Sequence, residues 1–344
     1  MSRPSPFFLR DCMSFIFSEI DYEKDGKQTG FLRLPHSVHR SAYGWMPIPI
    51  VMLKNGEGPT VLLMSGNHGD EYEGQGTICK LTQELEASDI LGRLIMLPMA
   101  NYPAALAGMR TSPVDEGNLN RAFPGAKDGT PTQIMADYIE NTLLPMCDYL
   151  LDMHAGGSSL VYPTTALRPK AETPEEDIFM AKLQEVFDAP YGILMAAGAG
   201  ADPRTSSAAA QRKGVRAMGT EAGGAGTVSP KILAEVDRGV RRYLNFVGLL
   251  PGYKPDAPRG IRLMEMTTDE HFVYARDEGL FEPYVEICTE VKKDQPAGAI
   301  HHPETPWVAP TIAHFKRDGL AVCQRMPGRV QRGDCLFHLI TDIE

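Results

Sequence analysis

The sequence predicts an α/β protein, with a three-layer α/β/α domain built on a mixed sheet and a small all-β unit after it. Three observations point to this class. Short apolar runs alternate with amphipathic helical patterns between residues 58 and 248. A stretch rich in proline and glycine follows at residues 250–260, and the rest of the chain shows short strand-like runs without a long helix. With 344 residues the chain is long enough for two domains, which we place at residues 1–255 and 256–344.

The first expected elements form a strand–helix–strand unit. Residues Thr60–Ser65 are an apolar run with the length of a buried strand. A helix is expected at Gly74–Glu86, because its apolar residues recur at spacings of three and four and so share one face. Those residues are Ile78, Leu81 and Leu85. The run Arg93–Pro98 is the next expected strand.

The pattern continues in the same way toward residue 248. Thr130 followed by Pro131 is typical of a helix N-terminus, and the helix that follows places four apolar residues on one face. They are Met135, Ile139, Leu143 and Met146. Tyr149–Met153 is the third expected strand, and Glu175–Phe187 and Pro230–Val247 are two further helices. Strands that alternate with helices predict a largely parallel sheet covered on both faces.

Charge and composition narrow the classes of partner. The 34 basic and 44 acidic residues give a net charge of −10, which opposes the non-specific binding of nucleic acids. No apolar run approaches the roughly 18 residues of a membrane span. The 6 cysteines are scattered and form no Cys-x-x-Cys pair, which favours a reducing compartment. We expect a cytoplasmic protein without nucleic-acid or membrane partners.

The C-terminal residues contain a weak internal repeat. Arg276-Asp-Glu-Gly-Leu280 is similar to Arg317-Asp-Gly-Leu320, and each is followed by a second basic and acidic segment. Two such half-motifs predict a duplicated hammerhead of the barrel-sandwich kind, as in biotinyl and lipoyl domains. The Met-Lys-Met hairpin of true carrier domains is absent from the sequence. We therefore expect this unit to serve packing or oligomerisation, in a protein that forms a homo-oligomer.

The segment between Leu63 and Gly74 carries the first candidate site residues. A strand ends there, and His68 and Glu71 follow three residues apart. A second strand ends near His154, which is followed by a glycine pair. Ligands of parallel α/β sheets bind beyond the carboxyl ends of the strands, so the three side chains are expected to meet. Two imidazoles and one carboxylate, with a fourth position open to water, form a catalytic zinc set.

A catalytic metal site of this kind also needs a proton carrier and groups that hold the substrate. Glu221, in a glycine-rich segment after a short apolar stretch, is the candidate proton carrier. Arg110, Asn120 and Arg121 lie between the two segments that supply the expected metal ligands. A planar guanidinium suits a carboxylate, and an amide beside it adds directional donors.

Taken together, these residues resemble the succinylglutamate desuccinylase/aspartoacylase family, a branch of the zinc carboxypeptidase-like fold with a C-terminal β domain. The resemblance rests on His68-x-x-Glu71, Asn118-Leu-Asn-Arg121, His154 and Glu221. It extends from about residue 45 to the C-terminus. One position departs from the pattern, since Asn118 stands where aspartoacylases have an aspartate.

The resemblance implies a cofactor and a role for each site residue. It implies one Zn²⁺ per chain, held by His68, Glu71 and His154. Glu221 would be the general base and proton shuttle. Arg110 would help to polarise the scissile carbonyl, while Asn120 and Arg121 would hold the substrate carboxylate.

Further segments are similar to one subgroup, the N-acetyl-L-2,4-diaminobutanoate deacetylases of bacterial ectoine degradation. They are Gly26–Ser37, Ala42–Ile50, Asn55–Thr60, Met109–Pro113 and Glu278–Pro283. The resemblance implies a small-molecule substrate, an N-acyl amino acid such as N2-acetyl-L-2,4-diaminobutanoate, which is hydrolysed to acetate and the free diamino acid. Where those relatives usually have Glu-Leu-Gly-Gly, this chain has Glu221-Ala-Gly-Gly, which could reflect a different acyl or amine group.

Three alternatives stay open at the level of sequence. The chain could be a desuccinylase or aspartoacylase-like deacylase of another N-acyl amino acid, or a true peptidase. It could also be a catalytically inactive metal- or metabolite-binding protein, although such a protein has no need of a proton shuttle at Glu221. A residue that recognises a side-chain ammonium is also expected, and Asp115, Glu116 and Asp202 are its candidates.

Overall fold

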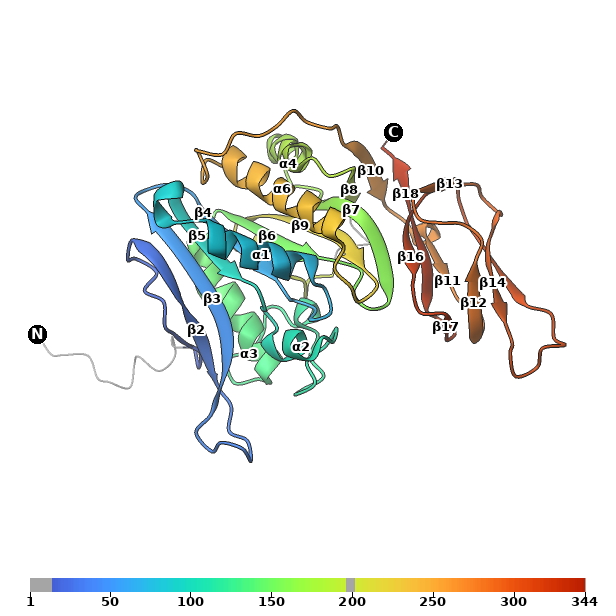
Figure 1. The fold of residues 1–344 in the computed structure, drawn as a ribbon, viewed down its shortest axis with the longest axis horizontal. Helices are drawn as coiled ribbons and strands as arrows, with labels where there is room; N and C mark the ends of the chain where they lie inside the picture. Colours follow the sequence, from blue (N-terminus) through green and yellow to red (C-terminus); the bar gives the residue numbers. More distant parts are fainter. Residues whose placement is uncertain (1–13, 196–201, 344) are drawn as a thin grey trace, which may run out of the picture.

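The computed structural model describes residues 14–195 and 202–343. Its centre is a mixed sheet of 14 strands (Figure 1). In the order in which they pair, the first nine strands are β1 (Phe17–Ser18), β2 (Gly26–Pro35), β3 (Trp45–Asn55), β5 (Gly92–Leu97), β4 (Thr60–Ser65), β6 (Tyr149–His154), β9 (Arg216–Gly224), β7 (Leu160–Pro169) and β8 (Tyr191–Met195). The sheet continues through β10 (Arg262–Met266), β18 (Cys335–Asp342), β16 (Gly319–Arg325) and β13 (Thr289–Val291), and β11 (Phe272–Tyr274) pairs with β18.

The four strands β5, β4, β6 and β9 are parallel to one another and form the middle of the sheet. Strands β3 and β7 flank them in the antiparallel sense, which confirms a mixed sheet. Every residue of β4 is buried, and its side chains alternate between two cores. Leu62 and Met64 pack into one core, and Val61 and Leu63 into the other. This two-sided burial explains why β4 reads as an uninterrupted apolar run.

Helices cover both faces of the sheet, as Figure 1 shows for α1 and α6 on one side and α3 on the other. The core that contains Val61 and Leu63 holds α1 (Glu73–Glu84), α4 (Pro174–Phe187) and α6 (Pro230–Phe246) against the sheet. The core that contains Leu62 and Met64 holds α3 (Pro131–Tyr138) and α5 (Ser206–Arg212). A short helix, α2 (Tyr102–Ala107), follows β5 near the carboxyl ends of the parallel strands. These layers confirm the expected α/β architecture.

The helix that begins after Thr130 differs from its expected form. It is regular only to Tyr138, continues as a wider π-helical turn at Ile139–Leu143 and ends in a 3-10 turn at Leu144–Met146. Pro145 lies in this last turn, and its missing N–H prevents a regular helical hydrogen bond there. The expected apolar face is nevertheless kept, since three of the four residues are buried and Met146 is half-buried.

From Arg262 onward the described chain forms strands and one short helical turn, with no long helix. A second sheet of four strands contains β15 (Thr311–His314), β14 (Pro296–His301), β12 (Gly279–Pro283) and β17 (Arg329–Val330). The main sheet also runs into this region, because β10 pairs with β8 and β16 pairs with β7. The hammerhead description and the boundary at residue 255 stay predictions. Within the described residues, no helix is long and apolar enough to cross a bilayer.

Candidate active site

Three side chains meet where the parallel strands β4 and β6 end. His68 follows β4 by three residues, Glu71 lies two residues before α1, and His154 is the last residue of β6. The chain between β4 and α1 turns tightly, with Gly66 at a φ of 66°. Gly69 packs on the backbone of α2, where a Cβ atom would lie 2.0 Å from a carbonyl group. The two glycines therefore let the loop carry both ligands back toward the sheet.

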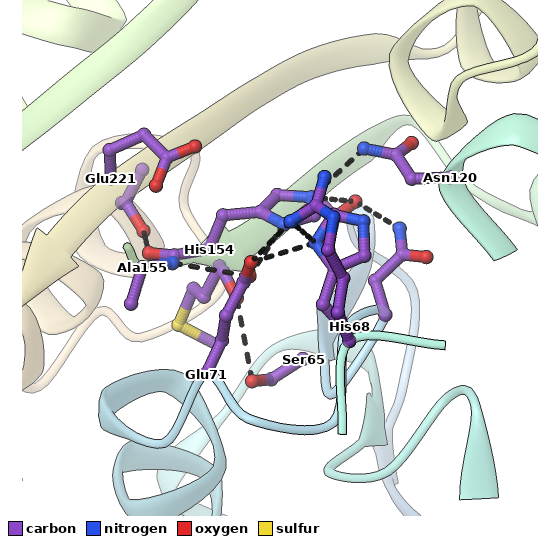
Figure 2. A network of polar contacts seen from close by, with 12 residues as sticks. Ser65, His68, Glu71, Asn120, His154, Ala155 and Glu221 are labelled. Atoms are coloured by element: carbon purple, nitrogen blue, oxygen red, sulfur yellow. Dashed lines mark hydrogen bonds and ion pairs between the residues drawn. The ribbon is translucent and has the colours of Figure 1, made fainter. Parts of the chain in front are cut away.

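The two imidazoles lie side by side next to one carboxylate, and each faces a different oxygen of it (Figure 2). The Nδ1 atom of His68 lies 2.7 Å from Oε1 of Glu71, and Nδ1 of His154 lies 2.8 Å from Oε2. One potential ligand atom from each residue lies within 4.8 Å of the others. The side chains of His68 and Glu71 are only 4% and 3% exposed. The expected set of two imidazoles and a carboxylate is thus brought together as a possible metal site.

The outer nitrogens of both imidazoles have acceptors of their own. Nε2 of His154 lies 3.0 Å from Oδ2 of Asp152, and Nε2 of His68 lies 3.2 Å from Oδ1 of Asn118. These partners place a proton on each Nε2, so in the neutral rings the lone pair of Nδ1 points toward Glu71. Lone pairs of imidazole and carboxylate then face one another. Such an arrangement of acceptors fits a bound cation, and Zn²⁺ accepts this donor set.

The electrostatics of the group also favour positive charge at its centre. Burial opposes ionisation, but the imidazoles of His68 and His154 hold the pKa of Glu71 well below its usual range. Burial likewise works against a charged His154, yet the carboxylates of Asp152 and Glu71 raise its pKa well above the usual value. The group of His68, Glu71 and His154 therefore favours a positive charge at its centre, which a bound proton provides when no metal ion is bound.

Glu221 is held beside this group by the pairing of β6 with β9. In the parallel register His154 is the partner of Glu221, so both lie at the same edge of the sheet. The Oε2 atom of Glu221 is buried and has no hydrogen-bond partner among the described residues. Burial, and then the negative charge of Glu71, raises the pKa of Glu221 to about 8. A carboxyl group in this state can take up and release a proton near neutral pH.

The remaining expected residues lie around the same cavity, which has a volume of about 400 Å³. Nη1 of Arg110 is 3.4 Å from Nδ1 of His68 and 3.6 Å from Oε1 of Glu71. Asn120 lies on the opposite side of the group from Glu221, with Nδ2 3.4 Å from Nε2 of His154 (Figure 2). Arg121 is half exposed at the rim. All seven residues expected from the sequence line this cavity.

The three candidates for ammonium recognition have other partners. The carboxylate of Asp115 accepts hydrogen bonds from the backbone N–H and the hydroxyl group of Thr132, and it does not line the cavity. Glu116 is exposed to solvent and also lies outside the cavity lining. Asp202 does line the cavity, but it forms ion pairs with Arg121 and Arg204. Its charge is therefore already balanced by two guanidinium groups.

Sequence reasoning missed the outer partners of the candidate metal site. Asp152 is the main one, since Oδ2 accepts hydrogen bonds from Asn67, from Ser206 and from His154. A local signal was available, because Asp152 and His154 are two residues apart on one strand and so point to the same face. Asn118 replaces the aspartate of aspartoacylases, but its Oδ1 atom still offers an acceptor to Nε2 of His68.

Replacing Asp152 with asparagine is expected to weaken metal binding about 10- to 100-fold. The carboxylate of Asp152 orients His154 and makes its ring more basic, and the substitution removes this negative charge. The measurement is a zinc titration against a competing chelator. Asp188→Asn is the matched control. Like Asp152, Asp188 is a buried aspartate with a cationic partner, here Arg238, but it lies outside the cavity lining. Equal zinc affinity in Asp152→Asn and the wild type would contradict this role.

Known proteins can now be compared with this fold and site. A model of the succinylglutamate desuccinylase/aspartoacylase catalytic domain matches residues 57–247. An N-alpha-acetyl-L-2,4-diaminobutyric acid deacetylase from Halomonas elongata is 39% identical over 345 aligned residues, which cover 99% of this chain and 97% of that protein. The chain belongs to the succinylglutamate desuccinylase/aspartoacylase family.

Two solved structures of family members share the whole fold. The product-bound ectoine utilization protein EutE (DoeB) from Ruegeria pomeroyi has a TM-score of 0.91 and 35% sequence identity, and the match covers 96% of this chain and 99% of that chain. A succinylglutamate desuccinylase/aspartoacylase from Rhodobacter sphaeroides has a TM-score of 0.90 and 36% identity, with 96% and 100% of the two chains covered. The C-terminal strands are therefore part of the shared structure.

Proposed function

We propose that this protein is a zinc-dependent amidohydrolase that removes the acetyl group from N2-acetyl-L-2,4-diaminobutanoate, as a step of ectoine catabolism. The observation that carries the proposal is the unpartnered carboxylate oxygen of Glu221 beside the group of His68, Glu71 and His154. The substrate is supported by two relatives, the diaminobutyric acid deacetylase of Halomonas elongata and the ectoine utilization protein of Ruegeria pomeroyi. The zinc carboxypeptidase-like architecture and a homo-oligomeric state belong to the same proposal.

The roles of the metal-site residues follow from their contacts. His68, Glu71 and His154 would hold one Zn²⁺, because their ligand atoms converge and their outer nitrogens are already paired. When bound, zinc supplies Lewis acidity, which lowers the pKa of a water molecule and polarises a carbonyl oxygen. Asp152 and Asn118 keep both rings in the tautomer whose Nδ1 faces inward.

Glu221 carries the proton in the proposed hydrolysis. Its buried Oε2 takes a proton from the attacking water, whose oxygen forms the new bond to the acyl carbon. The bond between the acyl carbon and the amide nitrogen then breaks, and Glu221 delivers the proton to the departing amine. Acetate and the free diamino acid leave. A carboxyl pKa near the working pH suits both halves of this transfer.

The cationic rim would hold the substrate. Arg110 lies next to Oε1 of Glu71, where its charge would offset the negative charge that develops on the carbonyl oxygen. Asn120 and Arg121 would bind the α-carboxylate, and the hydrogen bond from Arg121 Nη1 to the backbone carbonyl oxygen of Asn120 orients the guanidinium group. Their contacts act before and during the reaction, so they affect KM as well as kcat.

The test is the release of a free amine by zinc-loaded protein. We would compare N2-acetyl-2,4-diaminobutanoate, N-acetylaspartate and N-succinylglutamate, each with and without a chelator. Turnover of the first substrate alone, lost on chelation and restored by zinc, is the expected result. Turnover of another substrate would keep the metal site and overturn the subgroup. No turnover by protein with zinc bound would favour a binding protein over an enzyme.

A further inference from the structure

The wall of the cavity includes one histidine that the proposed reaction does not use. His338 lies on β18, close to the C-terminus, and lines the same cavity as the metal-site residues. The other described residues of the lining all precede residue 222. A side chain from the C-terminal strands thus reaches a site that is otherwise built by the α/β region.

The pairing of strands explains how His338 reaches the cavity. Strand β16 pairs with β7 at residues 160 and 161, next to Tyr162. In turn, Cys323 of β16 is the partner of His338 on β18. Figure 1 shows β16 and β18 beside the long strand β7. The rings of Phe272 and Tyr162 both pack edge-on against His338, at centroid distances of 4.6 Å and 5.7 Å.

The hydrogen bond from Tyr162 defines the tautomer of this imidazole. The hydroxyl oxygen of Tyr162 lies 2.6 Å from Nδ1 of His338. A phenol O–H is a stronger donor than the N–H of a neutral imidazole, and an imidazole nitrogen is a stronger acceptor than a phenol oxygen, so we assign the tyrosine as donor and Nδ1 as acceptor. Burial lowers the pKa of His338 to about 4, which leaves the ring neutral. The single ring proton is therefore on Nε2.

That N–H group is available to a ligand. Among the described residues Nε2 of His338 has no hydrogen-bond partner. This atom is not fully buried, so a ligand can reach it. Tyr162 is buried and His338 is half-buried, and both side chains line the cavity. His338 therefore offers the cavity a hydrogen-bond donor whose orientation is fixed by Tyr162.

We propose that His338 is a specificity-determining residue, which donates a hydrogen bond from Nε2 to a carbonyl or carboxylate oxygen of the substrate. The inference rests on the proposed function, because it assigns a substrate contact in that site. A neutral N–H donor binds an oxygen acceptor but not an ammonium group. His338 therefore sets which end of an N-acyl diamino acid lies at this side of the cavity, and the C-terminal strands become part of the active site.

The kinetic test uses the full-length, zinc-loaded enzyme. His338→Leu is expected to raise KM for the acetylated substrate about tenfold and to change kcat by less than about threefold, because one hydrogen bond to the bound substrate is lost. His338→Gln, which keeps an N–H donor at a similar position, should restore most of the loss. His271→Gln is the matched control, since His271 is buried in the 3-10 turn that precedes β11 and does not line the cavity.

Binding of the product identifies the oxygen. Calorimetry with 2,4-diaminobutanoate tests the α-carboxylate alone, because this product lacks the acyl carbonyl. A weaker product Kd in His338→Leu would assign the carboxylate, and an unchanged Kd with a raised KM would assign the acyl oxygen. An unchanged KM in His338→Leu, or a KM that His338→Gln fails to restore, would overturn the proposal.

The tautomer can be measured without turnover. Long-range ¹H–¹⁵N spectra of histidine-labelled protein at neutral pH should show His338 neutral with its proton on Nε2, and Tyr162→Phe should abolish this preference. A proton on Nδ1, or a charged ring, would overturn the inference whatever the kinetics. If the wild type turned over none of the substrates, the proposed function would fail together with the substrate contact, while the tautomer would still be decided by these spectra.

Discussion

Replacing Glu221 with glutamine is expected to lower kcat by about 10²- to 10⁴-fold without loss of zinc. Glutamine has nearly the same shape but cannot accept a proton from water or return one to the amine. The metal ligands are untouched, because Glu221 lies on the neighbouring strand and its buried Oε2 bonds to none of the described residues. Steady-state kinetics and the zinc content of the same sample check both halves of the expectation.

The matched control for this variant is Glu73→Gln. Glu73 is another buried glutamate, and burial raises its pKa too, but it lies outside the cavity lining. We expect kcat of Glu73→Gln to stay within a fewfold of the wild-type value. A normal kcat in Glu221→Gln would rule out this residue as the proton carrier.

The same substitution is expected to make the metal-free protein more stable than the metal-free wild type, by a difference that grows as the pH rises. The pKa of Glu221 is about 8 in the folded protein, against an ordinary value of 4.5. Between these values the folded state holds a proton that the unfolded chain has lost, so a higher pH favours unfolding. The penalty begins near pH 4.5, is complete above about pH 8 and amounts to roughly a few kcal/mol. Glutamine does not titrate and avoids it.

Urea denaturation of both proteins across this pH range, after removal of metal, measures the effect. The gain in the free energy of unfolding for Glu221→Gln over the wild type should grow with pH and then level off. Zinc is the internal control, because a nearby cation lowers the pKa of Glu221 and should shrink the difference. A gain that is independent of pH would contradict the raised pKa.

Local patterns were sufficient for much of the fold. Strand β4, helix α1 and strand β6 lie where apolar runs and spacings of three and four residues predict them, within about two residues at each end. The hairpin of β2 and β3 was not predicted, since its strands gain their partners from each other and from β5. The helix after Thr130 was predicted as regular, and its irregular end follows from Pro145 and the packing around it.

The candidate site divides in the same way. His68, Glu71 and His154 could be predicted because each follows or ends a strand, and parallel strands end at a common edge. Asp152 was within reach of the same reasoning, through the alternation of side chains on β6. His338 was not, because it is 176 residues away from Tyr162 in sequence and meets it only through the pairing of β16 with β7.

The sequence by itself determined the α/β class, the candidate metal-ligand set and the candidate proton carrier, because these depend on residue types next to strand ends. Only the tertiary structure decided which nitrogen of each imidazole faces inward, how far the pKa of Glu221 rises, and that a C-terminal strand enters the cavity. These properties depend on desolvation and on hydrogen bonds between residues far apart in the chain. Such terms arise only when the strands have paired and water has been excluded.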